Sequence, residues 1–119
     1  MRKESLNYIK TLIATDQYEE ALELLLSVDV AEFDGEYYYS AGECFFKKGD
    51  ISNALRSFER AVREDRKNVR YLMGLFKAYE AFQEEKKAID TAYQILRIKE
   101  GEGYVHGILN ILKDKISPN

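Results

Sequence analysis

The sequence predicts an all-α protein built as an array of three helical hairpins with one further helix at its end. Two observations carry this prediction. Along almost the whole chain of 119 residues, apolar residues recur every three or four positions, which is the spacing of one face of an α-helix. Short polar breaks interrupt this pattern at regular distances, and the only proline, Pro118, lies beyond the last break.

The array itself is indicated by a motif that recurs at a fixed distance. In each copy a polar break is followed by an alanine and then by apolar residues four and seven positions later. The three alanines are Ala21, Ala54 and Ala88, which lie 33 and 34 residues apart. The same offsets relate two other sets, Tyr8, Ala41 and Leu75, and Leu12, Phe45 and Tyr79. A constant period in this range is typical of stacked helical repeats.

The first hairpin is expected over residues 3–15 and 17–29, joined at the polar pair Asp16-Gln17. The apolar faces of its two helices are Leu6, Ile9, Leu12 and Ile13, then Ala21, Leu22, Leu25 and Val28.

The second hairpin is expected over residues 35–48 and 51–65. Gly49 can take the left-handed conformation that ends a helix, and either Asp50 or Ser52 can cap the helix that follows. The apolar faces are Tyr38, Ala41 and Phe45, then Leu55, Phe58 and Val62.

The third hairpin is expected over residues 68–82 and 85–99, with Gln83-Glu84 as its break, and a last helix over residues 103–116. The apolar faces of the hairpin are Leu72, Leu75, Phe76 and Tyr79, then Ile89, Ala92, Ile95 and Leu96. The last helix carries apolar residues on more than one stripe. This excess favours self-association through that helix, or an array that was once longer.

Composition narrows the class of protein. Lys and Arg number 18 and Asp and Glu 21, for a net charge of −3, which disfavours a nucleic-acid binder. Cys44 is the only cysteine, so no internal disulfide forms and a reducing compartment is favoured. The first residues contain no uninterrupted apolar run of the length expected in a signal peptide, and no segment has an apolar run long enough to cross a membrane. We therefore expect a cytoplasmic protein that is not inserted in a membrane.

These repeats resemble the tetratricopeptide repeat family. The match is closest in the second unit, where these residues occupy the family's positions in order: Tyr38, Ala41, Gly42, Phe45, Gly49, Ala54, Phe58 and Ala61. The resemblance implies repeats over about residues 2–34, 35–68 and 69–102, with residues 103–116 as a capping helix, in one domain spanning residues 1–119. The chain departs from the family at Asp16, which stands in place of a turn glycine, and at Arg66, which stands in place of a late proline. Phe76 is large and Ala92 small where the reverse is usual.

The implied fold is a right-handed α-solenoid whose first helices line a concave groove, where proteins of this family commonly hold a peptide. The residues that this geometry places on the groove are Lys3, Asn7, Lys10, Glu36, Tyr39, Ser40, Glu43, Phe46, Lys47, Arg70, Met73 and Lys77. We therefore expect a non-catalytic module that binds a protein or peptide. The alternative is a structural protein that assembles with itself through the terminal helix.

Small residues are expected where the helices approach most closely. Gly42 and Ala54 are predicted to supply the contact within the second hairpin, with Phe58 filling the space towards the next hairpin. The exchange of sizes at Phe76 and Ala92 is interpreted as compensation, since a core tolerates neither voids nor overfilling.

Three consecutive tyrosines open the second unit. Successive helical residues turn by about 100°, so Tyr37, Tyr38 and Tyr39 cannot face the same way. One interpretation places Tyr38 in the core, Tyr37 on the preceding hairpin and Tyr39 at the groove; the other buries all three between hairpins. Some members of the family hold a C-terminal carboxylate in a clamp of Lys, Asn and Arg side chains. This clamp is disfavoured here, because Leu6, Ser40 and Gly74 stand at three of the expected places and only Arg70 fits.

Catalysis finds little support in the sequence. His106 is the only histidine, which excludes a His-rich metal site, and Cys44 falls where a helix packs a small apolar side chain. We expect no catalytic residues, no metal and no cofactor. Charge is unevenly spread, with nine acidic and no basic residues from Asp16 to Glu43, and eight basic and four acidic residues from Lys47 to Arg70. These opposed patches either steer a charged partner, pair two copies, or form an ordinary solvated exterior.

Overall fold

In the computed structural model, residues 1–98, 107–108, 110 and 113–114 are described. The six α-helices of residues 1–98 are α1 (Lys3–Ala14), α2 (Tyr18–Leu26), α3 (Gly35–Lys47), α4 (Ile51–Glu64), α5 (Val69–Ala81) and α6 (Glu85–Arg97). The short 3-10 turn η1 (Val30–Glu32) lies between α2 and α3, and no strand occurs in the described residues. The predicted all-α class is confirmed, and the largest difference in bounds is at α2, which ends at Leu26 rather than at residue 29.

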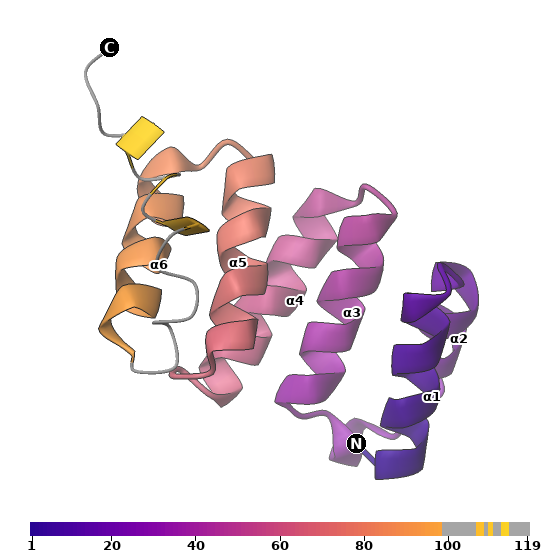
Figure 1. The fold of residues 1–119 in the computed structure, drawn as a ribbon. Coiled ribbons are helices and arrows are strands. Elements are labelled where there is room, and N and C mark those ends of the chain that lie inside the picture. Colours follow the sequence, from indigo (N-terminus) through magenta and orange to yellow (C-terminus); the bar gives the residue numbers. More distant parts are fainter. Residues whose placement is uncertain (99–106, 109, 111–112, 115–119) are drawn as a thin grey trace.

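The helices pair into three hairpins that stand side by side, α1–α2, α3–α4 and α5–α6 (Figure 1). Helix α3 contacts both α1 and α5, and α4 also contacts α5. The first helices of the three hairpins therefore form one row, with α3 in the middle. None of the described helices combines the length and the apolar character needed to cross a membrane.

The three intra-hairpin turns share one backbone geometry. Gly49 has φ 84°, and Asp16 and Gln83, which occupy the equivalent places, both have φ 62°. At each turn the third residue past the helix donates its N–H to a carbonyl five residues earlier, at 2.8–2.9 Å: Gln17 to Leu12, Asp50 to Phe45 and Glu84 to Tyr79. This Schellman pattern satisfies the last carbonyls of each first helix and fixes the hairpin geometry. The repeat period is therefore visible in the backbone as well as in the sequence.

Side-chain caps begin each helix of the second hairpin and the first helix of the third. Asp50 accepts a hydrogen bond from the N–H of Asn53 at 3.3 Å, so of the two candidate caps of α4 it is Asp50 that acts. Asn68 caps α5 in the same way. Asp34 caps α3 by accepting from the N–H of Tyr37 at 2.9 Å.

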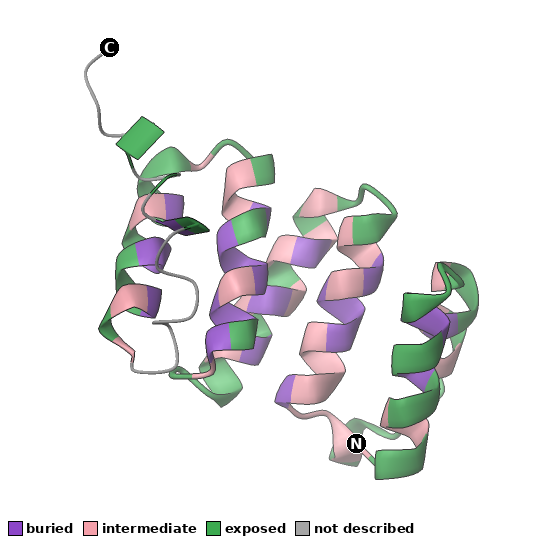
Figure 2. Cartoon of the chain, viewed as in Figure 1, coloured by how far each residue is buried: buried purple, intermediate pink, exposed green. Residues whose placement is uncertain are grey.

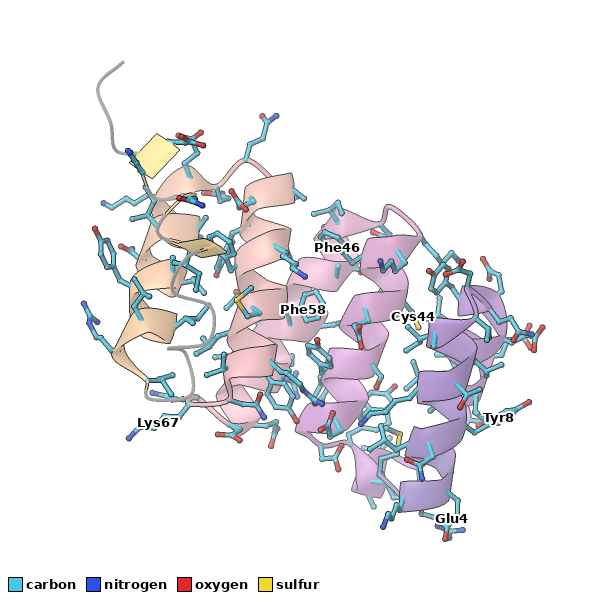
Figure 3. All side chains as sticks on the ribbon, viewed as in Figure 1. Glu4, Tyr8, Cys44, Phe46, Phe58 and Lys67 are labelled. Carbon is cyan, nitrogen blue, oxygen red and sulfur yellow. The ribbon has the colours of Figure 1, made fainter. Side chains whose placement is uncertain are left out.

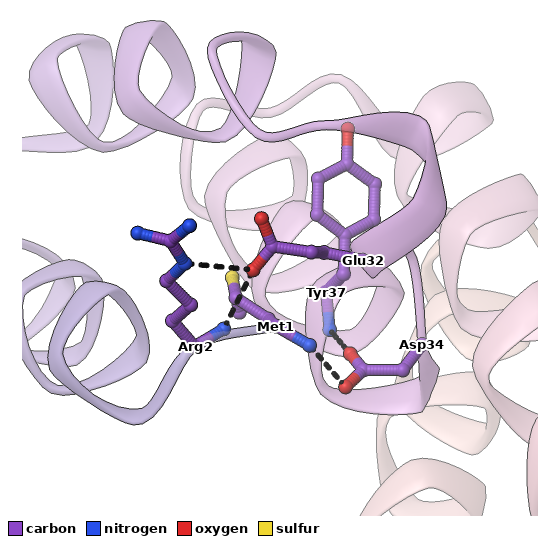
Figure 4. Close-up of polar contacts among 5 residues, drawn as sticks. All are labelled: Met1, Arg2, Glu32, Asp34 and Tyr37. Atoms are coloured by element: carbon purple, nitrogen blue, oxygen red, sulfur yellow. Dashed lines mark hydrogen bonds and ion pairs between the residues drawn. The ribbon is translucent and has the colours of Figure 1, made fainter.

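Asp34 also ties the N-terminal segment to the second hairpin (Figure 4). The amino group of Met1 donates to its carboxylate at 2.5 Å, while Arg2 donates its backbone N–H to Glu32 at 3.1 Å. Partial burial by itself raises the pKa of Asp34, but the hydrogen bonds from the Met1 amino group and the Tyr37 N–H lower its pKa overall.

Replacing Asp34 by alanine is expected to lower the free energy of unfolding by about 1 kcal/mol at pH 7, because α3 loses its cap. Since the pKa of Asp34 is lower in the folded chain, its carboxylate stabilises the fold above the unfolded pKa of about 4. That contribution disappears as the pH falls through the folded pKa, so the two proteins converge in acid. Urea titrations followed by circular dichroism across this range measure the difference. Asp34→Asn, which keeps a capping oxygen, serves as the control; equal stability of Asp34→Ala and the unmodified chain at pH 7 contradicts the assignment.

Buried residues lie on all the helices from α1 to α6 (Figure 2). One buried cluster joins α1, α2 and α3, a second joins α4 and α5, and a third joins α5 and α6. Phe45 packs against the first two clusters, and Val62 and Tyr79 pack against the last two. Each hairpin thus buries its sides against its neighbours, as a repeat array requires.

The ring of Phe58, which is 3% exposed, is closely packed against two glycines. A Cβ added at Gly42 of α3 would lie 2.6 Å from the Cδ1 and Cε1 atoms of this ring, and one added at Gly74 of α5 would lie 2.7 and 2.6 Å from the same two atoms. Gly42 and Ala54 were predicted to supply the close contact within this hairpin; the atoms that a Cβ at Gly42 would meet first belong to Phe58. The expected role of Phe58, bridging to the next hairpin, is confirmed by its closeness to Gly74 and by its place in the buried cluster of α4 and α5.

Phe76 and Ala92 belong to one buried cluster, at 1% and 0% exposure. Their proximity supports the interpretation that the two sizes are exchanged between the paired helices. Most of the predicted terminal helix, residues 103–116, lies outside the described residues. The self-association expected through that helix therefore stays a prediction. The described residue Ile108 of the predicted helix is buried in the α5–α6 cluster.

Candidate binding groove on the first helices

A pocket opens between α3 and α5 and is the first candidate for a binding site. Its volume is about 100 Å³. The lining residues are Tyr39, Glu43, Phe46 and Lys47 of α3, Phe58 of α4, and Met73, Gly74 and Lys77 of α5. Because these positions lie three or four apart on α3 and on α5, each set shares one face of its helix. Of the twelve residues predicted for the groove, six line this pocket.

Two residues that the groove prediction omitted form part of the pocket wall. Gly74 has no side chain, so the ring of Phe58 behind it forms part of the pocket wall. The signal was present in the sequence, because Gly42 and Gly74 both lie inside predicted helices, where glycine is unfavourable without a packing reason. That both glycines approach the same ring is a tertiary fact.

An aromatic layer supports one end of the pocket. Tyr39 stacks on Tyr71 with ring centroids 5.4 Å apart, and its ring lies 5.6 Å from that of Phe58. The guanidinium of Arg70 covers the Tyr39 ring at 5.0 Å and donates two hydrogen bonds to Glu36, at 2.6 and 2.7 Å. Glu36 and Arg70 were predicted as groove residues, and the structure shows that their side chains form a hydrogen-bonded ion pair with each other.

The tyrosine run divides among three neighbours. Tyr37 packs on the α1–α2–α3 cluster and stacks on Phe33 at 3.9 Å, whereas Tyr39 lines the pocket. Tyr38 is half-buried rather than part of the core, since Arg60 donates a hydrogen bond to its hydroxyl at 2.9 Å and covers its ring at 4.8 Å. The interpretation that buries all three between hairpins is therefore wrong, and so is the placement of Tyr38 in the core.

Ser40 does not belong to the accessible groove, because its side chain is 1% exposed. Helix α3 packs against α1, α2, α4 and α5, so positions that turn away from its groove face are covered. Lys3, Asn7 and Lys10 are exposed on α1, as predicted, but they do not line the pocket.

Glu43 lies half-buried in the pocket wall. Burial raises the pKa of its carboxyl, and the nearby charges of Arg70, Lys47, Lys77 and Lys10 oppose this only in part. The ion pairs found among the described residues do not include Glu43. A desolvated carboxylate within a cationic surround is unusual for a surface selected only for solubility.

Replacing Glu43 by glutamine is expected to stabilise the fold at pH 7. A carboxyl whose pKa is higher in the folded chain destabilises that state when ionised, so the native protein gains stability as the pH falls through the raised pKa. The glutamine variant lacks this dependence, and its advantage shrinks towards pH 4. Thermal melts of both proteins at several pH values test the point. A variant that melts below the native protein at pH 7 would show that Glu43 makes a stabilising contact there.

Cys44 follows Glu43 but is not part of the groove. Its side chain is fully buried in the α1–α2–α3 cluster, and burial raises the pKa of the thiol to about 12. Such a thiol is a poor nucleophile. His106, the only histidine, lies outside the described residues. Within the part of the chain that the structure describes, no group of three His, Cys, Asp or Glu side chains is placed to hold a metal ion.

Stacked hairpins with an open row of first helices define a helical-repeat protein of the solenoid type. The family model described as the tetratricopeptide repeat matches residues 9–68 and 39–103. The chain therefore belongs to the tetratricopeptide repeat family, whose repeats commonly mediate protein–protein interaction and are generally not enzymatic. A comparison with curated proteins found no match.

Proposed function

We propose that this protein is a non-catalytic module that binds a segment of a partner protein in the groove along α1, α3 and α5. The observation that carries the proposal is the pocket between α3 and α5, where Phe46 and Met73 are accessible beside charged side chains. Apolar anchors surrounded by polar groups are typical of the centre of protein interfaces.

The groove is formed by helices rather than by loops. Its walls are held by the Glu36–Arg70 hydrogen bonds and by the stacking of Tyr39 on Tyr71. A preformed site of this kind binds a segment with little ordering of its own residues. The buried, free Cys44 is compatible with a reducing compartment, and we place the protein in the cytoplasm.

The proposal is tested by selecting peptides from a random library displayed on phage and mapping the selected peptides by NMR chemical shifts. We expect shifts at residues on the groove side of α3 and α5, and loss of binding in Met73→Gln and Phe46→Ser. The exposed Arg63 of α4 supplies a control, since Arg63→Ser leaves the groove intact. Circular dichroism establishes that each variant is folded. Shifts confined to α2, α4 or α6 would overturn the proposal.

A further inference from the structure

We propose that the groove selects an acidic segment carrying a single aliphatic side chain, which enters the pocket between α3 and α5 while flanking carboxylates bind Lys10, Lys47 and Lys77. This inference rests on the proposed function and specifies the chemistry of the partner. It follows from the distribution of charge around the pocket, from the pocket's size and from the position of Glu43.

The three lysines are available to a partner. Lys47 and Lys77 line the pocket from α3 and α5, and Lys10 on α1 lies close enough for its charge to act on Glu43. All three are exposed, and none takes part in an ion pair with another described residue. Arg70, in contrast, is already bonded to Glu36. The groove is therefore electropositive on a chain whose net charge is −3.

Charge complementarity accordingly favours an acidic occupant. Opposite charges across an interface accelerate encounter and exclude partners of the wrong sign. A basic segment would meet the three lysines, with only Glu43 to attract it inside the pocket. An uncharged segment would leave these lysines solvated and gain nothing from them.

The pocket limits what the partner can insert. Its volume of about 100 Å³ is smaller than the ~150 Å³ cavity that holds a benzene ring. A leucine, isoleucine or methionine side chain therefore fits better than an aromatic one. The apolar surface that it would meet belongs to Phe46, Phe58 and Met73.

Glu43 determines where the partner's carboxylates lie. Its own carboxyl is in the pocket wall, so a second carboxylate inside the pocket would be repelled and left desolvated. The acidic residues of the partner consequently flank the inserted side chain, at the level of the lysines. Removing the charge of Glu43 while keeping its size then strengthens the binding of an acidic segment.

The test uses short fluorescein-labelled peptides of one design: a central leucine flanked by Asp and Glu, the same peptide with Asn and Gln flanks, and the acidic peptide with a central serine. Fluorescence anisotropy is measured with the full chain at low and high salt. We expect the acidic leucine peptide to bind at least about tenfold more tightly than either other peptide, with affinity falling as salt rises. Lys47→Glu and Lys77→Glu should weaken its binding by a similar factor, and Glu43→Gln should strengthen it.

Lys67→Glu is the matched control, because Lys67 is an exposed lysine between α4 and α5, away from the pocket lining (Figure 3). Binding of the neutral peptide as tight as that of the acidic one, at the same groove residues, overturns the inference and leaves the proposed function standing. If none of these peptides binds and selected peptides map away from α3 and α5, both fail. If light scattering shows a dimer, and Lys47→Glu or Lys77→Glu disperses it, the groove holds an acidic face of a second copy such as α2, and the inference of a separate partner is overturned.

Discussion

Truncating Phe58 to alanine is expected to lower the free energy of unfolding by about 3–5 kcal/mol, the range found when a buried aromatic ring is removed. The ring is 3% exposed and connects three helices, since it belongs to α4 and contacts Gly42 of α3 and Gly74 of α5. Its loss leaves a void beside the backbone of α3 and α5. Gly42 and Gly74 have no side chains that could move into this void. Because small proteins are stable by only about 5–15 kcal/mol, this single change brings the chain near its unfolding threshold.

Urea denaturation followed by circular dichroism measures this loss, with the midpoint and the slope fitted separately. Phe82→Ala is the matched control, because Phe82 lies at the end of α5 and is 48% exposed. We expect the control to change stability by less than about 1 kcal/mol. A Phe58→Ala variant as stable as this control would show that α3, α4 and α5 do not depend on the ring for their packing.

Replacing Gly74 by alanine is expected to destabilise the fold by about 1–3 kcal/mol, which is the cost of inserting a methyl group into a filled core. On helix propensity alone the change would be favourable by about 1 kcal/mol, so a loss isolates the packing effect. The new Cβ would lie 2.6 Å from Cε1 of Phe58, and the ring cannot retreat freely because Gly42 meets the same two atoms from α3.

A second substitution distinguishes this clash from any other effect of alanine. Phe58→Leu removes the ring edge that the methyl group meets, so the double variant should be more stable than the sum of the two single changes predicts. Gly107→Ala is the control, since a Cβ there meets no described atom within 4 Å. Strict additivity of Gly74→Ala and Phe58→Leu would contradict the proposed contact.

The repeat period, the helices and their apolar faces could be predicted from the sequence because each depends on local chemistry. Gly49 and its counterparts Asp16 and Gln83 end three helices with the same turn, and the spacing of apolar residues sets which side of each helix is buried. Half of the groove residues could be placed for the same reason, since residues such as Glu43 and Lys47 share a helix face whatever the helix packs against.

Tertiary structure alone decided which side chains remain accessible on that face. The sequence predicted that Ser40 and Arg70 lie in the groove with the other predicted residues. Neighbouring helices bury Ser40, however, and Arg70 donates its hydrogen bonds to Glu36. The sequence likewise contains Gly42 and Gly74, but it does not reveal that both glycines make room for the ring of Phe58. The physical reason is that helical periodicity is a property of consecutive residues, whereas accessibility and pairing depend on distances between hairpins that lie 33 or 34 residues apart in the chain.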